Sequence, residues 1–181
     1  EEALGEKKIG STLKGISPAY MDKTGRLGLR VGDILKPDFN DIYQREKDRY
    51  KTILGYYHFN DEVDDSAWLN AVDELRKYRI EDTEVFINQM LKEGKNILAE
   101  GAQGSMLDID FGSFPFVTSS NTIAASACIG LGVAPKHIGK VYGIFKAYAT
   151  RVGSGPFPTE LFDENGDKLR EKGREFGSTT G

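Results

Sequence analysis

The sequence predicts an α/β fold, in which helices pack on a β-sheet. Residues 39–57, 66–79 and 83–92 repeat apolar side chains every three or four positions, which is typical of amphipathic helices. Residues 95–100 and most of 140–149 are short apolar stretches bounded by turn residues, which favours buried strands. Because these strands alternate with helices along the chain, we expect layers of both kinds.

Each helical pattern has its own start or stop signals. In the first, the apolar side chains that fall near one face are Ile42, Tyr43, Tyr50, Ile53 and Leu54. In the second they are Trp68, Leu69, Val72, Leu75 and Tyr78. Asp65 or Ser66 is placed to cap the second helix, and the third has Asp82 as N-cap and Gly94 just past its end.

The remaining segments predict loops and two further helices. Residues 9–19 are rich in Gly, Ser and Thr and contain Pro18, so we expect a loop there. Residues 121–131 have the small side chains of a helix that another element can approach closely. Residues 163–177 predict a turn followed by a short amphipathic helix.

Composition restricts the class of protein. The chain has 181 residues, and we expect residues 1–181 to belong to one domain without an internal boundary. Hydrophobic residues make up 39% of it, which is enough for a core and too much for a disordered chain. A net charge of −4 argues against a general nucleic-acid or anionic-membrane surface.

The ends of the chain and its single cysteine indicate its context. Cys128 has no second cysteine for an internal disulfide, which suits a reducing compartment. No apolar run approaches the roughly 20 residues that span a bilayer, and the start does not resemble a signal peptide. Since the first residue is not Met and the last residues are a Gly, Ser and Thr string, we expect an internal segment of a longer protein.

The motif "GAQG", residues 101–104, follows an expected strand. Glycine adopts backbone angles closed to other residues, so Gly101 and Gly104 would let the main chain approach a ligand. The amide of Gln103 both donates and accepts hydrogen bonds, which suits a sugar hydroxyl, a phosphate or a base edge. An ordinary strand-to-loop turn explains the same residues, and both interpretations remain open.

The motif "TSSN", residues 118–121, precedes the expected small-residue helix. Its groups would either hold a phosphate at the helix N-terminus or act as ordinary N-caps, from Ser120 or Asn121. Asp108 and Asp110 lie two positions apart, on one face of a strand. Such a pair either joins further oxygen ligands around a metal or forms solvated or capping acids.

Basic and hydroxyl side chains gather in other loops as well. The N-terminal loop and the segment after it contain Ser11, Thr12, Lys14, Lys23, Arg26 and Arg30, the two arginines at helical spacing. Arg151 lies among turn residues, and "GSTTG" closes the chain. Hydroxyl and cationic groups suit phosphate recognition, so these loops together predict a nucleotide or phosphorylated-metabolite site built from distant segments.

Three stretches carry a resemblance to a known family: "GSTLKGISPAYMDKTGRLGLRVGDIL", "EGAQGSMLDIDFGSFPFVTSSNT" and "KAYATRVGSGPFPTELFDENGDKLREKGREFGSTTG". They resemble adenylosuccinate synthetase, and their spacing matches the family from Gln103 to Gly181. The resemblance implies the central part of a large mixed-sheet, P-loop-NTPase-like single-domain ligase with helices packed on the sheet.

The resemblance also implies an activity. The family condenses IMP with L-aspartate at the expense of GTP, and gives adenylosuccinate, GDP and phosphate in purine nucleotide biosynthesis. It first phosphorylates the 6-oxygen of IMP, and the aspartate amine then displaces that phosphate. The implied enzyme is a cytoplasmic homodimer that uses Mg²⁺, whose ligands lie outside this chain, and neither nucleic acid nor membrane is an expected partner.

Site residues carry over from the family position by position. Gln103 is the expected catalytic residue within this chain, because it positions the IMP 6-oxygen. Thr12 and Val152 are expected to contact IMP, and Thr118 to contact its phosphate. Arg26 is expected to cross the homodimer interface and reach the IMP phosphate of the partner subunit. The start of the loop for the aspartate substrate matches Gly177, Ser178, Thr179, Thr180 and Gly181.

The chain also departs from the family pattern. It has Leu13 and Lys14 where Gly-Arg is usual, and Ser17 where Gly is usual. The family's N-terminal phosphate loop, its catalytic Asp and His, its magnesium contacts and its guanine-recognition segment are missing from these 181 residues. We therefore expect no metal site within this chain and no ligase activity from it alone.

Two other classes of function remain open on the residues themselves. A non-catalytic nucleotide- or phosphate-binding module would have the same loops without the catalytic groups. An interaction protein would dock a partner on the aromatic helices of residues 40–92. A glycine-rich phosphate loop upstream, with arginines directly after Gly181, would favour the ligase.

Overall fold

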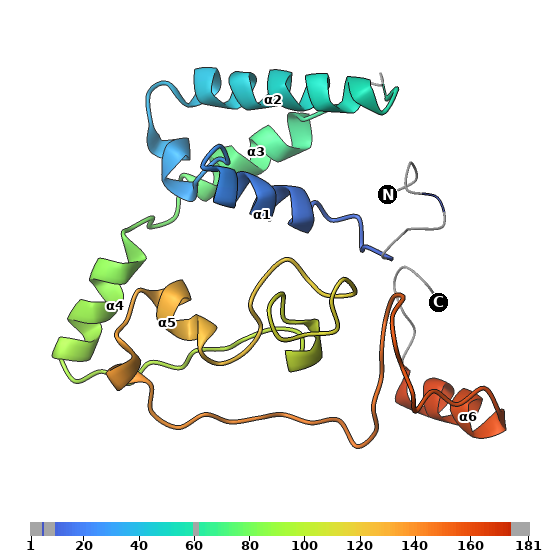
Figure 1. The fold of residues 1–181 in the computed structure, drawn as a ribbon. Coiled ribbons are helices and arrows are strands. Elements are labelled where there is room, and N and C mark those ends of the chain that lie inside the picture. The colour runs from blue at the N-terminus through green and yellow to red at the C-terminus, as the bar shows by residue number, and fades with distance from the viewer. Residues whose placement is uncertain (1–4, 6–9, 60–61, 175–181) are drawn as a thin grey trace. The chain divides into compact units, whose positions relative to one another are not determined.

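A computed structural model describes residues 5, 10–59 and 62–174 of the chain (Figure 1). They form two compact units, each described by itself below. The helical unit comprises the described part of residues 18–95. The loop unit comprises the described part of residues 1–17 and 96–181.

The helical unit contains most of α1, the 3₁₀-helix η2 and three further helices. Their bounds are α1 (Ile16–Gly25), η2 (Val31–Leu35), α2 (Phe39–Tyr56), α3 (Ser66–Leu75) and α4 (Thr83–Lys92). The prediction for α4 is confirmed at both ends, and that for α2 to within one residue. The prediction for α3 is wrong at its end, because the chain tightens there: the N–H of Tyr78 donates to the carbonyl of Leu75 at 3.0 Å, a three-residue bond.

The start of α1 corrects the loop predicted over residues 9–19. The helix begins at Ile16, so Pro18 lies in its first turn. The first N–H groups of a helix have no acceptor within the helix, so a proline there removes no hydrogen bond. Proline at this position is therefore compatible with a helix and does not mark a loop.

A small apolar core joins η2, α2 and α3. Ile34, Phe39 and Val72 are buried, with Phe39 only 3% exposed. The half-buried residues packed against them are Tyr43, Leu69 and Ile80. Burying a side chain the size of Phe39 stabilises the fold by roughly 1.5–3 kcal/mol, so these contacts dominate the packing of the unit.

Polar contacts fasten α1 to α2. Asp22 of α1 accepts a hydrogen bond from the hydroxyl of Tyr50 at 2.6 Å and forms an ion pair with Arg49 at 2.7 Å. Arg49 also pairs with the buried Glu46 at 2.8 Å. Burial would raise the pKa of Asp22, but its bonds to Arg49 and Tyr50 outweigh this and lower the pKa.

The loop unit contains little regular structure. Its elements are η3 (Ser105–Leu107), α5 (Ser126–Leu131), η4 (Pro135–His137) and α6 (Glu164–Gly173). The predicted C-terminal helix is confirmed by α6, which Asp163 caps by accepting N–H bonds from Asn165 at 3.0 Å and Gly166 at 3.1 Å. Across the described part of the chain, no helix has the length and apolar character needed to cross a membrane.

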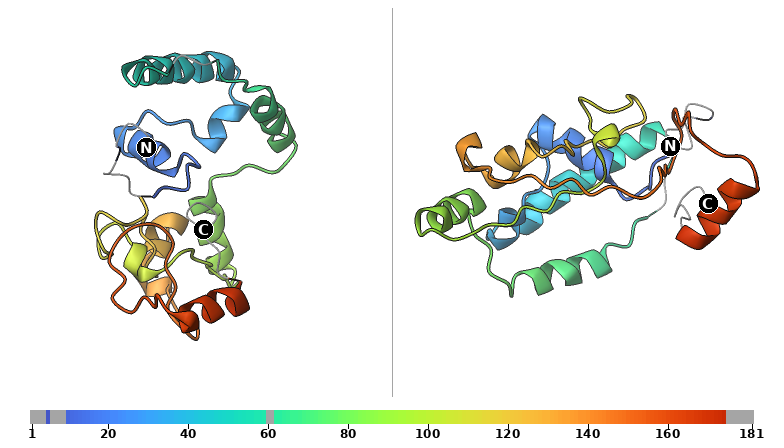
Figure 2. Two further views of the ribbon diagram at one scale, coloured as in Figure 1. Left: turned by 90° about the vertical axis from the view of Figure 1, so that its right-hand side faces the viewer. Right: turned by 90° about the horizontal axis from the view of Figure 1, so that it is seen from below.

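The predicted strands do not form among the described residues, none of which is in a β-strand. Residues 95–100 and 140–145 instead run as irregular chain without a ladder partner, as the long stretch after η4 shows (Figures 1 and 2). A strand exists only where a neighbouring strand satisfies its N–H and C=O groups. The described chain offers no such neighbour, and Ile144 and Phe145 are 99% and 92% exposed.

Candidate functional site

The two central motifs of the sequence meet in the loop unit. The N–H of Thr118 donates to the carbonyl oxygen of Leu107 at 2.9 Å. The hydroxyl of Thr122 donates to the carbonyl oxygen of Gly104 at 2.8 Å. Residues 103–122 therefore form a closed loop, with "GAQG" at its start beside "TSSN" at its end.

Gln103 has an unusual backbone conformation at the start of the closed loop. Its φ is +61°, in the left-handed region that non-glycine residues seldom adopt. The sequence predicts such freedom at the flanking glycines, but Gly104 is extended, with φ −142° and ψ 162°. The strained residue is therefore Gln103 itself, whose amide is the expected contact to IMP, and strain of this kind gathers at functional sites. The side chain of Gln103 is exposed.

Asp108 lies at the centre of the closed loop and has no exposed surface. Burial would raise the pKa of Asp108, but four backbone N–H groups outweigh burial and lower the pKa to about 2. Asp108 is therefore neither solvated nor the cap of a helix, because its buried carboxylate accepts N–H groups of the loop itself. Within the described residues, no group of three or more His, Cys, Asp or Glu side chains is arranged to hold a metal.

No helix begins directly after residues 118–121, so the N-cap interpretation of "TSSN" is wrong and the phosphate interpretation loses its helix N-terminus. The contact of Thr118 with a phosphate stays a prediction. The helix α5 begins at Ser126 with Ala125 at the N-cap, five residues later than expected. The amide of Asn121 donates to Asp108 at 3.2 Å instead. Asp108 also accepts the backbone N–H groups of Thr122 and Ile123. Because these groups bond to the closed loop, the helix begins only after them.

The N-terminal segment of the loop unit contacts two of its other loops. Gly10 has a φ of +80°, and a Cβ built on it would lie 3.2 Å from the Cα of Gly153. The hydroxyl of Ser119 donates to that of Ser17 at 2.9 Å. These contacts bring together the segments that carry three expected IMP-contacting residues, Thr12, Thr118 and Val152. The side chains of Thr12 and Val152 are exposed, and Thr118 is half-buried.

The side chain of Arg151 bonds two loops to each other, a role that the sequence did not predict. Its guanidinium donates to the carbonyl oxygens of Phe116 at 3.0 Å and Ser154 at 2.9 Å. Gly155 follows with a φ of +119°, and a Cβ on it would lie 2.7 Å from the Cβ of Phe116. From the sequence, Arg151 is predicted to lie in a phosphate-binding loop. The nearby glycine was the available signal that a second segment packs closely there.

Arg26 belongs to the helical unit and also has a left-handed backbone, with φ +61°. The N–H of Arg26 donates to the carbonyl of Lys23 at 3.2 Å, and that of Leu27 to the carbonyl of Asp22 at 2.9 Å. This is a Schellman ending of α1, with arginine where glycine is usual. Because α1 ends before Arg26, the predicted helical spacing of Arg26 and Arg30 is wrong.

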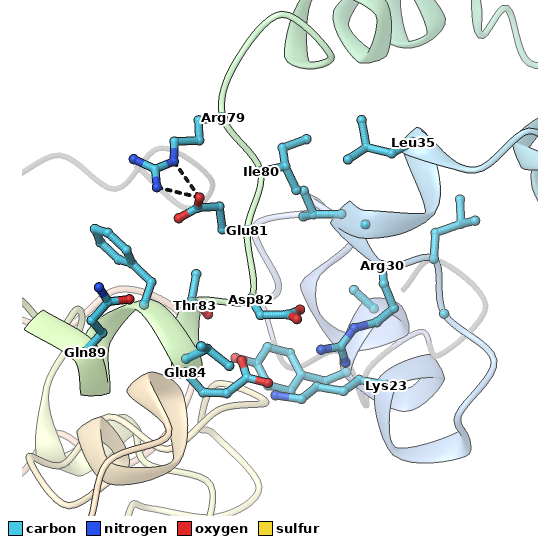
Figure 3. A pocket seen from close by; sticks show the side chains of 18 residues that line it. Lys23, Arg30, Leu35, Arg79, Ile80, Glu81, Asp82, Thr83, Glu84 and Gln89 are labelled. Atoms are coloured by element: carbon cyan, nitrogen blue, oxygen red, sulfur yellow. Dashed lines mark hydrogen bonds and ion pairs between the residues drawn. The ribbon is translucent and has the colours of Figure 1, made fainter.

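An open pocket of about 1270 Å³ lies within the helical unit (Figure 3). Lys23 and Arg30 line it from α1 and the segment after α1, and Asp82 and Glu84 line it from the start of α4. Acids and bases thus share the lining, which gives the pocket no preference for an anion or a cation. Arg26 is not among its lining residues.

The described residues therefore divide the expected site between the two units. The loop unit carries four of its members, Thr12, Gln103, Thr118 and Val152, and the helical unit carries Arg26. The expected aspartate loop, residues 177–181, lies outside the described residues. Sequence reasoning also underrated Asp108, although an acid between Leu107 and Ile109 is an unusual neighbour for two apolar residues.

Comparison with protein families gives one match over the full length of the chain. A family model described as adenylosuccinate synthetase matches residues 1–181. An adenylosuccinate synthetase from Cytophaga hutchinsonii is 60% identical over 184 residues, which cover 100% of this chain and 43% of that protein. One from Porphyromonas gingivalis is also 60% identical over 184 residues, with the same coverage of each chain.

A solved structure is similar as well. The fully ligated adenylosuccinate synthetase from Plasmodium falciparum has a TM-score of 0.88 and 39% sequence identity to this chain. The similarity covers 99% of this chain and 42% of that one. The chain thus spans less than half the length of the proteins it matches.

Proposed function

Because the chain belongs to the adenylosuccinate synthetase family, we propose that the protein of which it forms part joins IMP to L-aspartate at the expense of GTP. The observation that carries this proposal is the family match over residues 1–181, supported by 60% identity to a synthetase from Cytophaga hutchinsonii. The products are adenylosuccinate, GDP and phosphate, and the step belongs to purine nucleotide biosynthesis. The proposed location of the enzyme is the cytoplasm.

The reaction proceeds in two steps. The 6-oxygen of IMP attacks the γ-phosphorus of GTP while N1 of the purine loses its proton, and the bond from that phosphorus to the β,γ-bridging oxygen breaks and releases GDP. The aspartate amine then attacks C6 of the purine, a C–N bond forms, and phosphate leaves with the former 6-oxygen while the amine loses a proton. Negative charge spreads over the transferring group, so fixed hydrogen-bond donors are the main contribution of the protein.

The loop unit supplies the contacts to IMP in this proposal. The amide of Gln103, on a backbone that departs from common conformations, holds the 6-oxygen in line for attack. Thr118 contacts the 5′-phosphate, and Thr12 and Val152 contact the rest of the nucleotide. The contact of Gly10 with Gly153 and the bond of Ser17 to Ser119 support this grouping.

The helical unit supplies a contact to the second subunit. In the proposed homodimer, Arg26 reaches the IMP phosphate bound by the partner subunit. The exposed side chain of Arg26 and its strained backbone support a role outside its own unit. Residues 177–181 begin the loop that receives L-aspartate.

Magnesium and the sheet belong to the complete protein. The described residues do not fit a Mg²⁺ site, because Asp108 is engaged by N–H donors and no acidic cluster forms. We assign the metal ligands to the rest of the protein. The exposed apolar segments at residues 95–100 and 140–145 become strands of a mixed sheet there, and both units become parts of one P-loop-NTPase-like domain.

The test is product formation by the complete protein. Adenylosuccinate is measured while IMP, GTP, L-aspartate or Mg²⁺ is omitted in turn, and the proposal requires that each omission abolishes product. A folded complete protein that binds IMP and forms no product with all four present would overturn the ligase and leave a nucleotide-binding module. The 181-residue chain is the matched control, from which no product is expected.

A further inference from the structure

The closed loop of residues 103–122 depends on one buried carboxylate. Asp108 has no exposed surface. Within the described residues, its carboxylate accepts hydrogen bonds from N–H groups and forms no ion pair with a Lys or Arg. The donors are the backbone N–H groups of Asp110 (2.9 Å), Phe111 (3.2 Å), Thr122 (2.6 Å) and Ile123 (3.3 Å), with the side-chain amide of Asn121 (3.2 Å). A buried charge is tolerated only when it is compensated in this way.

These donors come from both sides of the closed loop. One group lies just after Asp108, at residues 110–111, and the other begins at the last residue of the "TSSN" motif, at residues 121–123. Asp108 therefore holds the end of the loop against its middle. Thr118 lies between the two groups, and its N–H is held by the carbonyl of Leu107 next to Asp108.

The same arrangement reaches Gln103. Asp108 fixes the backbone of Thr122, whose hydroxyl donates to the carbonyl oxygen of Gly104 at 2.8 Å. Gly104 adjoins Gln103, which has the left-handed backbone. One carboxylate thus sets the positions of two segments that the proposed function assigns to opposite ends of IMP, the purine and the phosphate.

We propose that Asp108 is a positioning residue for IMP, which acts by holding Gln103 and Thr118 at a fixed separation without touching the nucleotide. This inference rests on the proposed function. The carboxylate offers acceptors only, so it satisfies donors from two directions at once. Asparagine has nearly the same size, but it replaces one acceptor oxygen with an NH₂ group that would face N–H donors.

The experiment compares Asp108→Asn with wild type in the complete protein. KM is measured separately for IMP, GTP and L-aspartate, together with the folded fraction. We expect the KM for IMP to rise by about 10-fold to 100-fold, because small displacements of positioning groups have effects of that size. The KM for GTP is expected to stay within about twofold of wild type.

Asp163→Asn is the matched control. Asp163 also accepts backbone N–H bonds, at the start of α6, but it lies outside the closed loop. We expect it to lower stability without changing the KM for IMP. A general loss of order would change all three KM values together in both variants. A positioning role instead changes the KM for IMP in Asp108→Asn alone.

A second variant keeps the inference testable if Asp108→Asn does not fold. Thr122→Val has the same shape and retains the backbone N–H to Asp108, but loses the bond to Gly104. We expect a smaller rise in the KM for IMP. An unchanged KM for IMP in a folded Asp108→Asn, or in Thr122→Val when the first variant is unfolded, would overturn the inference. Absence of product from the wild-type protein would instead overturn the proposed function.

Discussion

The helical unit and the loop unit are held together by different kinds of contact. In the helical unit, side chains contact one another: Phe39 and Val72 pack in an apolar core, and Asp22 of α1 pairs with Arg49 of α2. In the loop unit, side chains hold the main chain, because Asp108 accepts backbone N–H bonds and Arg151 donates to backbone carbonyls. Regular helices satisfy their own backbone groups, whereas irregular loops must find partners elsewhere.

This difference suits the two proposed roles. A binding loop must present hydroxyl, amide and backbone groups from an irregular chain, as residues 103–122 do, and an apolar core would leave those groups unpaired. A buried acceptor such as Asp108 fixes the irregular chain without converting it to a helix or strand. In the helical unit the comparable acceptor is Asp33, which is only half-buried and accepts the backbone N–H of Arg30 at 2.7 Å, and the expected site residue there is Arg26 at the end of a helix.

Phe39→Ala should have the largest effect on stability. Phe39 is 3% exposed, and removal of a buried phenyl ring typically lowers the free energy of unfolding by about 3–5 kcal/mol. Chemical denaturation of the complete protein measures the loss. Tyr56→Ala, at the end of the same helix and 81% exposed, is the control and should change stability little. Equal effects from the two would show that the core of the helical unit does not dominate its stability.

Gly112→Ala tests the loop unit in the same way. A Cβ on Gly112 would lie 2.4 Å from the carbonyl oxygen of Met106 and 2.5 Å from that of Asp108. Both are backbone atoms of the closed loop, so we expect a loss of about 1–3 kcal/mol in the free energy of unfolding. Gly101→Ala meets nothing within 4 Å and is the matched control. A Gly112→Ala variant as stable as Gly101→Ala would contradict the close packing of this backbone.

Arg26→Gly should raise stability while it weakens IMP binding. A non-glycine residue in the left-handed region costs roughly 1–2 kcal/mol, so glycine should raise the free energy of unfolding by about 1 kcal/mol. Arg26→Ala removes the same guanidinium but keeps the strain, and separates the two effects. Denaturation and titration with IMP give both quantities. A glycine variant no more stable than the alanine variant would count against strain at this position.

Acid should weaken the contribution of Asp108 to stability, an effect that appears only at low pH. The pKa of Asp108 is about 2 in the folded chain and about 3.9 in an unfolded one, so the unfolded state binds more protons between these values. Its contribution to stability is full above about pH 4 and is lost as the pH falls to about 2. Unfolding measured across this range should show the difference between wild type and Asp108→Asn shrinking with acid. A constant difference would mean that the carboxylate of Asp108 titrates normally.

The helices were predictable because their signals are local. Gly94 has a φ of +73°, and the N–H groups of Gly94 and Lys95 donate to carbonyls of the last turn of α4, at Leu91 and Met90. Glycine after an apolar period is a short-range pattern that predicts this ending. The cap of α6 is equally local.

The closed loop and the strands were not predictable in the same way. The N–H groups that would have begun a helix near residue 121 instead bond to Asp108, an interaction no periodic pattern encodes. Residues 140–145 have an apolar sequence suited to a strand, but a strand also depends on a neighbour elsewhere in the protein. The left-handed backbones of Arg26 and Gln103 gave no signal, because neither residue type favours that conformation.

The short spacing of the contacts to Asp108 has a consequence for folding. Every donor to its carboxylate lies between 2 and 15 residues further along the chain. Closing such a short segment costs little conformational entropy, so this part of the chain should form early and independently of distant segments. Hydrogen exchange at the amides of residues 110, 111, 122 and 123 should then report one common free energy of opening, as a single cooperative unit.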